Sequence, residues 1–240
     1  MQAFIYLPDS KREQLKRCIS VFVQTYIEKI SPTFDYIDEE AQVQAYNHYC
    51  ELDESSNSEY LDQLDFAEAA KEYGYQHWEG MALMQYNTKL MSISTLYQFW
   101  EQQVRKLVFE ELTSHLKFTI EKGGSVEFKT FCTRGIDDIK EMFLQCGVDM
   151  KLLKSWAKID ELRLLQNVIK HGDGKSASNL EELRPDYFRH VGGTKAMDLY
   201  LSTLNERVLD VNENEIFTYG EALKEFWDEL PGMMYFNPNL

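Results

Sequence analysis

The apolar residues of this chain recur with the period of an α-helix over most of its length. The first helical stripe runs through Ser10–Ile30 and consists of Leu15, Cys18, Ile19, Phe22, Val23, Tyr26, Ile27 and Ile30. Later segments repeat this spacing, and none alternates convincingly between apolar and polar residues as a half-buried strand does. Only 12 Gly and 5 Pro interrupt the 240 residues, which argues against a sandwich or a Gly-rich nucleotide-binding fold. The sequence therefore predicts an all-α fold.

The expected helices are bounded by Pro, Gly and polar clusters. They cover residues 10–30, 38–52, 58–116, 135–147, 149–171 and 213–230. In the second helix we expect Val43, Tyr46 and Cys50 to face inward. In the third, Gly74 and Gly80 are the expected breaks, because glycine weakens a helix interior.

Weaker local signals mark the remaining segments. The pair Ser178 and Glu181 has the spacing of a capping box and predicts a helix that begins at Ser178 and stops before Pro185. Residues 122–125 contain Gly-Gly and predict a loop. Residues 2–7 and 205–212 are the weak strand candidates.

The charge of the chain is −15 and is unevenly distributed. Residues 31–82 contain thirteen Asp or Glu and one Lys, whereas residues 151–175 contain six Lys or Arg against three Asp or Glu. A chain this acidic is a poor non-specific binder of nucleic acid, but a local basic patch can hold a phosphate. The acidic stretch is either a solvated helical face or a docking surface for a basic protein partner.

Cysteine usage and hydropathy bear on the compartment. The four Cys form no CxxC pair, and the N-terminal apolar stretch is too short for a signal peptide, so we expect reduced thiols and a cytoplasmic protein. No apolar run approaches the ~18 residues of a membrane span. We expect one all-α domain over residues 1–240, which also divides into an acidic N-terminal region, 1–85, and a core, 86–240.

The five His show neither HxxxH nor HExxH spacing. The sequence therefore predicts no metal site, and no cofactor motif is present.

The most informative segment is the helix that ends at His171. Arg163, Asn167 and His171 are spaced i, i+4 and i+8, and Lys170 lies just beside Arg163, so the four share an arc of about 100°. The opposite arc is apolar and faces the core; it carries Leu162, Leu165, Val168 and Ile169. Trp156 and Ile159 precede the polar residues on the same side, which predicts an apolar patch that continues into a cationic one, as in a groove or a subunit interface.

These residue types suit metal-independent cleavage of RNA, in which the 2′-hydroxyl is the nucleophile. Histidine titrates near neutral pH and can transfer protons. Arginine and lysine stabilise the charge that develops on a phosphodiester, and asparagine can orient the His ring or contact phosphate or ribose. The alternative is purely structural: Lys170 and His171 complement the dipole of a helix that Gly172 caps.

The stretch Leu162–His171 followed by Gly resembles the HEPN superfamily of helical domains. The match is to its Arg-Asn-x-x-x-His ribonuclease motif near the end of a long helix, here as Asn167-Val-Ile-Lys-His171. Gln166 stands where the motif has Arg, and Arg163 lies one turn earlier. The helix Ser94–Glu101 also resembles the partner helix of bacterial HEPN-like proteins.

The resemblance implies a HEPN-like bundle over 86–240 and a homodimer whose two motifs meet across a groove. It implies the catalytic residues Arg163, Asn167 and His171, with RNA contacts from Gln166, Lys170 and Lys175. HEPN ribonucleases cut RNA without metal in bacterial toxin–antitoxin and antiviral defence systems. Many relatives have lost catalysis and serve as interaction modules, such as defence-system subunits or antitoxin-type partners. Both a ribonuclease and a non-catalytic module therefore remain open.

Overall fold

The computed structural model describes residues 4–55, 63–115 and 128–237, most of which lie in helices. The α-helices are α1 (Asp9–Thr25), α2 (Ile37–Ser55), α3 (Gln63–His115), α4 (Phe128–Phe131), α5 (Ile136–Gln145), α6 (Trp156–His171), α7 (Lys175–Leu183), α8 (Ala196–Tyr200) and α9 (Glu215–Glu229). The short helical turns are the π-helix η1 (Tyr26–Ile30) and the 3-10 turns η2 (Ser31–Phe34), η3 (Met150–Leu152) and η4 (Pro185–Tyr187). The strands are β1 (Phe4–Tyr6), β2 (His190–Val191), β3 (Thr194–Lys195) and β4 (Met233–Tyr235). The all-α prediction is confirmed.

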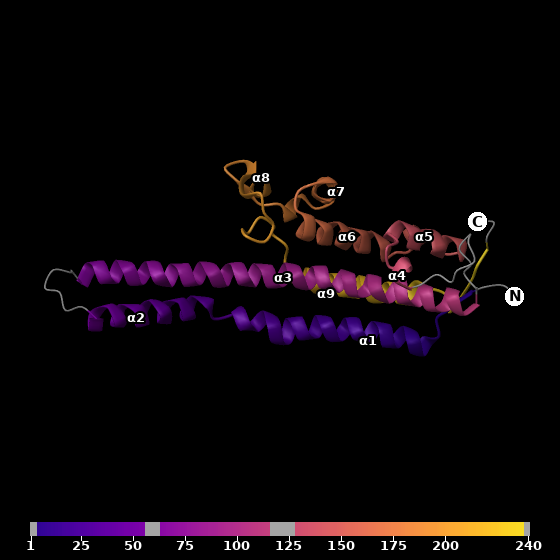
Figure 1. Ribbon diagram of the computed structural model, residues 1–240, viewed down its shortest axis with the longest axis horizontal. Helices are drawn as coiled ribbons and strands as arrows, with labels where there is room; N and C mark the ends of the chain where they lie inside the picture. The colour runs from indigo at the N-terminus through magenta and orange to yellow at the C-terminus, as the bar shows by residue number, and fades with distance from the viewer. Residues whose placement is uncertain (1–3, 56–62, 116–127, 238–240) are drawn as a thin grey trace.

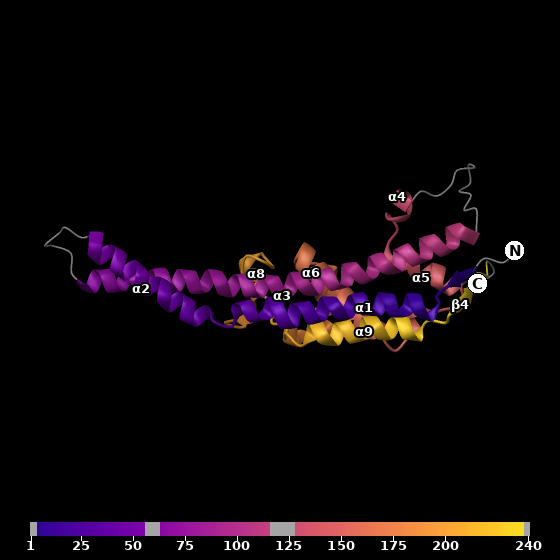
Figure 2. The ribbon, with the colours of Figure 1, turned by 90° about the horizontal axis from the view of Figure 1, so that it is seen from below.

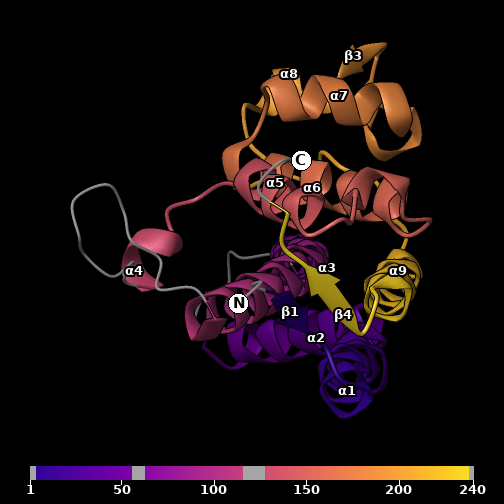
Figure 3. The same ribbon diagram turned by 90° about the vertical axis from the view of Figure 1, so that its right-hand side faces the viewer.

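The α3 helix runs along the long axis of the molecule and organises the other elements around it (Figure 1). α1 and α2 follow each other along one side of α3, and α9 lies beside α1 (Figure 2). α5 and α6 cover the opposite side of α3, and α7 and α8 form an outer layer (Figure 3). The bundle therefore has α6 sandwiched between the long helix and the outer helices.

The two ends of the described chain meet in a small antiparallel sheet. β1 pairs with β4, with Phe4 opposite Tyr235, and the backbone N–H of Leu7 donates to the carbonyl of Gly232 at 2.9 Å. Residues 2–7, a weak strand candidate in the sequence, thus contain a strand. In 205–212 there is only an isolated bridge between Phe188 and Leu209.

The core lies where α3, α5, α6 and α9 converge on aromatic side chains. The rings of Trp100 and Phe226 meet edge to face with centroids 5.0 Å apart, and Trp227 adds a second edge contact to Phe226 at 5.1 Å. α1 joins this core by a close approach: a Cβ on Gly220 of α9 would lie 2.6 Å from the Val23 side chain of α1. Glycine is therefore required for α1 and α9 to pack this tightly.

At one end of the molecule α2 and the first part of α3 form a two-helix arm, α2 with residues 63–85, that extends beyond the other helices (Figures 1 and 2). The predicted breaks at Gly74 and Gly80 are wrong, because α3 is continuous through both. Gly74 instead allows the two helices to approach: a Cβ there would lie 2.7 Å from the Cβ of Ala45 and 2.9 Å from the carbonyl oxygen of Ala41. Gly80 has open space around it.

The inward face expected for α2 is also wrong. Val43 is 55% exposed and Tyr46 is 68% exposed, while Ile37 and Ala41 are buried against α3. Because the arm is only two helices thick, small residues at the contact bury enough surface and the larger side chains remain outside. Cys50 is half-buried.

The capping box expected at Ser178 is not present. α7 begins three residues earlier, so Ser178 lies inside the helix and its hydroxyl donates to the carbonyl of Gly174 at 3.4 Å. The loop predicted for residues 122–125 lies outside the described residues.

Candidate functional site at the end of the α6 helix

α6 is held at both ends by contacts from other parts of the chain. At its start, the Glu229 carboxylate of α9 accepts from the backbone N–H of Lys154 at 2.7 Å and of Ser155 at 3.1 Å, and from the Ser155 hydroxyl at 2.6 Å. A carboxylate at a helix N-terminus satisfies free N–H groups and complements the helix dipole. α6 begins at Trp156 rather than at 149 as predicted, because the extended backbone of Leu153 (φ −69°, ψ 140°) separates it from the turn η3.

At its other end α6 stops at Gly172, as the sequence predicts. Gly172 has φ +75°, a backbone conformation that favours glycine, and its N–H donates to the carbonyl of Val168 at 2.9 Å. The segment 197–205 then covers this end. The Thr203 hydroxyl donates to the carbonyl of Ile169 at 3.1 Å, which satisfies one of the free carbonyls of the last turn.

α3 holds the 197–205 segment in place from below. The hydroxyl of Tyr86 donates to the carbonyl of Thr203 at 2.9 Å, and the side-chain amide of Asn87 donates to the carbonyl of Leu204 at 2.8 Å. Two neighbouring residues of α3 thus fix the wall that faces the end of α6.

Lys170 and His171 are the predicted site residues that the structure brings together. Both side chains are exposed, and among the described residues neither has a hydrogen bond or an ion pair. They line a pocket of about 430 Å³ whose other wall includes Asp198 and Ser202. Lys170 also borders a second pocket of about 600 Å³ between α3 and α4.

The second pocket combines positive charge with aromatic rings. Arg105, Lys106 and Lys170 supply the cations, and Phe99 and Phe128 supply the rings. Arg105 is paired with Glu101 at 2.8 Å. Basic and aromatic side chains together are typical of surfaces that bind single-stranded nucleic acid.

Arg163 and Asn167 lie on the same helix but have polar partners within it. The Nε of Arg163 donates to the Asp160 carboxylate at 2.7 Å, and its two terminal amino groups have no hydrogen bond among the described residues. The side-chain oxygen of Asn167 accepts from Gln166 at 2.6 Å. With a rise of about 1.5 Å per residue, Arg163 and His171 are about 12 Å apart along the axis.

Gln166 and Lys175 differ from the other predicted contacts. Gln166 is only 6% exposed, and its side-chain oxygen is buried with no hydrogen-bond partner among the described residues. Its side chain therefore belongs to the core side of α6 and is not accessible to a ligand in this conformation. Lys175 is exposed at the first residue of α7.

The predicted exposed apolar patch is absent from α6. Trp156 is 7% exposed and Ile159 is 1% exposed, so both belong to the core. The Lys140 ammonium lies over the Trp156 ring, 5.6 Å from its centroid. The pattern on α6 alone could not reveal that α5 and α9 cover this side.

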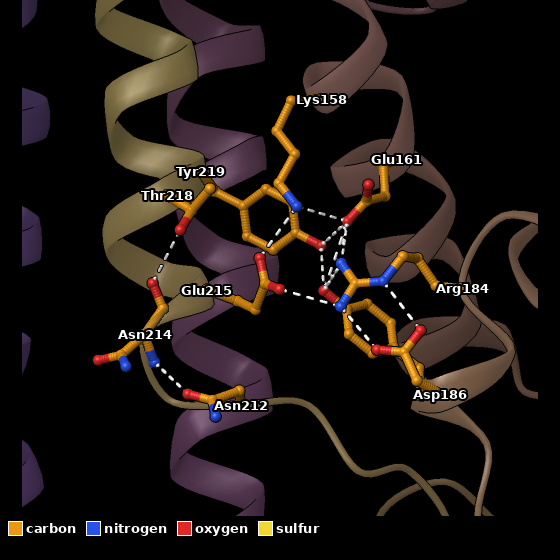
Figure 4. A network of polar contacts seen from close by, with 10 residues as sticks. Lys158, Glu161, Arg184, Asp186, Asn212, Asn214, Glu215, Thr218 and Tyr219 are labelled. Carbon is orange, nitrogen blue, oxygen red and sulfur yellow. Dashed lines mark hydrogen bonds and ion pairs between the residues drawn. The ribbon is translucent and has the colours of Figure 1, made fainter.

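A polar network that sequence reasoning missed joins α6, η4 and α9 (Figure 4). One Glu161 oxygen accepts from Lys158, Arg184 and the Tyr219 hydroxyl, each at 2.8 Å. Glu215 accepts from Lys158 and from Arg184, each at 3.0 Å. Burial alone would raise the pKa of Glu215, but these two cations outweigh it and lower the pKa below its ordinary value of 4.5. Only the i, i+3 spacing of Lys158 and Glu161 was readable in the sequence.

No protein-family model, curated protein or solved structure matches this chain. Within the described residues, no helix carries an apolar stretch long enough to cross a bilayer. Within the same residues, no three His, Cys, Asp or Glu side chains converge as a metal-binding group, and all four Cys are free thiols.

Proposed function

We propose that the chain is a metal-independent endoribonuclease of the HEPN type, acting in bacterial toxin–antitoxin or antiviral defence, with its site at the end of α6. The observation that carries the proposal is the pair Lys170 and His171, which are adjacent, exposed and unpaired among the described residues beside a pocket. A histidine free of partners can exchange protons with a substrate, and an unpaired lysine can bind phosphate. The resemblance of the surrounding motif to HEPN ribonucleases supports the same assignment.

In this proposal His171 is the proton-transfer residue and Lys170 stabilises the charge on the scissile phosphate. Arg163 is oriented by Asp160, and its terminal amino groups remain for phosphate. Because Arg163 and His171 are about 12 Å apart along the helix, Arg163 binds a phosphate next to the scissile one or serves the site of a second copy. Asn167 contacts ribose or phosphate when it exchanges its bond to Gln166, and Lys175 extends the basic surface onto α7.

Cleavage at the 2′-hydroxyl needs two proton transfers. One group removes the proton of the attacking 2′-hydroxyl, and another protonates the 5′-oxygen that leaves. Each copy of the site supplies one histidine, so a homodimer with two His171 residues facing one groove completes the acid–base pair. RNA binding then offsets the repulsion between the two cationic patches.

The test is cleavage of a labelled single-stranded RNA by the wild-type chain and by His171→Ala, with and without EDTA. We expect cleavage products that end in a 2′,3′-cyclic phosphate, unchanged by EDTA, and no cleavage by His171→Ala. His190→Ala is the matched control, because His190 is also exposed and lies on β2, away from α6. If Arg163 serves the scissile phosphate of the second copy, Arg163→Ala should lower the rate by roughly 10²–10³, the scale of one electrostatic donor. If it binds the neighbouring phosphate, the same substitution should raise KM instead. Equal cleavage by His171→Ala and the control would refute the site.

A second candidate function, a non-catalytic interaction module, is favoured by the two-helix arm. The arm coincides with most of the acidic stretch 31–82. It exposes large apolar side chains beside the charges: Val43, Tyr46, Leu64, Tyr73 and Tyr75. Such a mixture fits a basic protein partner better than solvent alone.

The arm can be tested with a basic probe, poly-L-lysine, whose binding is followed by fluorescence. A double charge reversal in the arm, Glu39→Lys with Glu68→Lys, should weaken binding far more than the reversal Glu206→Lys with Glu225→Lys. All four carboxylates are exposed, and the second pair lies outside the arm. An equal loss in both variants would mean that only the net charge matters. This second function is favoured if the wild-type chain does not cleave RNA and only the charge reversal in the arm weakens poly-L-lysine binding.

A further inference from the structure

A pocket of about 390 Å³ lies between α3 and the segment 189–213, and the α6 site uses none of its residues. It gathers side chains of both charges: Lys89, Arg189, Arg207, Asp210 and Glu213. Three cations against two carboxylates leave a positive excess here, although the chain as a whole carries −15. A local excess of positive charge of this kind favours the binding of an anion.

Lys89 is the charged group of this pocket that combines burial with the lack of a partner. Its side chain is half-buried, and among the described residues it has no hydrogen bond and no ion pair. Burial lowers the pKa of Lys89, and the nearby charges of Asp210 and Glu213 only partly oppose this shift. A desolvated ammonium without a partner is costly, and a bound anion would remove that cost.

The two arginines are held at the rim of the pocket. Arg189 donates through one terminal amino group to the carbonyl of Arg207 at 2.8 Å. The Arg207 guanidinium lies 5.6 Å from the centroid of the Trp78 ring. Neither guanidinium is paired with a carboxylate among the described residues, so each still presents donors to a ligand. Guanidinium groups are well matched to phosphate oxygens.

The carboxylates of the pocket are arranged to accept hydroxyl donors. Glu213 accepts from the hydroxyl of Tyr26 at 3.3 Å and from the hydroxyl of Ser31. The Asp210 carboxylate has no hydrogen-bond or ion-pair partner among the described residues. Opposite charges that share a pocket without touching leave room for a ligand carrying both an acidic group and hydroxyl groups.

We propose that this pocket binds a small sugar phosphate, with the phosphate on Lys89, Arg189 and Arg207 and a sugar hydroxyl on Asp210. A single carboxylate ligand would satisfy fewer donors than three cations provide, whereas a phosphate dianion has three oxygens to share among them. The volume falls within the range of about 300–1,000 Å³ for small-molecule sites and exceeds what phosphate alone would fill.

The test is isothermal titration calorimetry of the full chain with ribose 5-phosphate, inorganic phosphate and ribose. We expect saturable binding of ribose 5-phosphate, weaker binding of inorganic phosphate and none of ribose. Lys89→Gln and Arg207→Gln should each weaken ribose 5-phosphate at least about tenfold, the scale of one charge-assisted hydrogen bond. Lys151→Gln is the matched control, because it removes one exposed lysine charge far from the pocket lining.

Because Arg207 is exposed, Arg207→Gln should leave the fold intact. This variant therefore still tests the proposal if Lys89→Gln disturbs folding. Above about pH 7.5 the phosphate is already a dianion, because its second pKa is about 6. From there the affinity should fall as the pH rises further, because binding needs the ammonium form of Lys89, whose pKa burial lowers. No saturable binding by the wild type, equal affinity for inorganic phosphate, or equal loss in the Lys151 control would each overturn the proposal. The outcome is independent of RNA cleavage, since no residue of the α6 site is changed.

Discussion

Glu161 should be a main stability determinant of the contact between α6, η4 and α9, and the substitution Glu161→Gln measures its charge. The side chain of Glu161 is only 14% exposed, and one of its oxygens receives two cationic donors, Lys158 and Arg184, each at 2.8 Å. The same oxygen accepts the Tyr219 hydroxyl at 2.8 Å. Glutamine keeps the size of the side chain and an acceptor oxygen but removes the negative charge.

The expected cost follows from these contacts. A charge-assisted hydrogen bond is roughly twice as strong as a neutral one, which contributes about 1 kcal/mol. Glu161→Gln removes the negative charge from both bonds while Lys158 and Arg184 stay charged. If each bond weakens by about 1 kcal/mol, the unfolding free energy falls by about 2 kcal/mol. For a chain of this size, about 2 kcal/mol corresponds to a fall of roughly 4–8 °C in Tm. Tyr219→Phe, which removes one hydroxyl donor to Glu161, should cost about 1 kcal/mol.

The assay is urea and thermal unfolding followed by circular dichroism at neutral pH. Glu221→Gln on α9 is the matched control: Glu221 pairs with Lys224 at 2.7 Å, but its side chain is 50% exposed. Exposed pairs contribute little, so this control should cost less than about 0.5 kcal/mol. If Glu161→Gln destabilises the protein no more than Glu221→Gln, the network does not stabilise the fold and the reasoning fails.

Two further predictions concern the arm and the start of α6. Gly74→Ala should destabilise the chain by about 1–3 kcal/mol, because the new Cβ would lie 2.7 Å from the Cβ of Ala45. Gly80→Ala should stabilise the chain by about 0.5–1 kcal/mol, because nothing lies within 4 Å of a Cβ there. Equal Tm shifts of the two variants in thermal unfolding would contradict this prediction. Burial alone would raise the pKa of Glu229, but hydrogen bonds from Ser155 and the neighbouring backbone lower it below 4.5. The stabilisation by the Glu229 carboxylate is therefore present above its pKa in the unfolded chain and is lost as the pH falls through its pKa in the folded chain. Glu229→Gln should lower Tm at neutral pH and flatten the plot of Tm against pH below about pH 5.

The sequence predicted the helices well because helical periodicity is a local property. The stretches 10–30 and 213–230 were located to within a few residues, and the helix end at Gly172 was read correctly. The predictions are wrong where packing against a second helix decides which side chains are buried. Val43 appears apolar enough to be buried, but only the close approach of α2 and α3 at Gly74 shows that the contact lies elsewhere.

In the candidate site, too, only the features that depend on a single helix could be predicted from the sequence. The arc that joins Lys170 and His171 follows from helix geometry, and both side chains are exposed as expected. The partner of Arg163, Asp160, lies within reach on the same helix and could have been anticipated from its i, i+3 spacing. The contact between Glu161 and Arg184 joins residues 23 positions apart, so no periodicity within one helix could reveal it.

An uninterrupted α3 links the two proposed sites. The buried hydroxyl of Tyr86 donates to the carbonyl of Thr203, in the wall that faces His171. It also accepts the N–H of Leu209 at 3.2 Å, in the lining of the 390 Å³ pocket that contains Lys89. Lys89 follows Tyr86 by three residues and so lies on the same face of α3. A helix broken at Gly80 would place this turn near a helix start, whereas in the continuous α3 it lies well inside the helix. The 203–209 segment therefore lines both pockets: Thr203, Leu204 and Asn205 border the pocket of His171, and Arg207 and Leu209 line the pocket of Lys89.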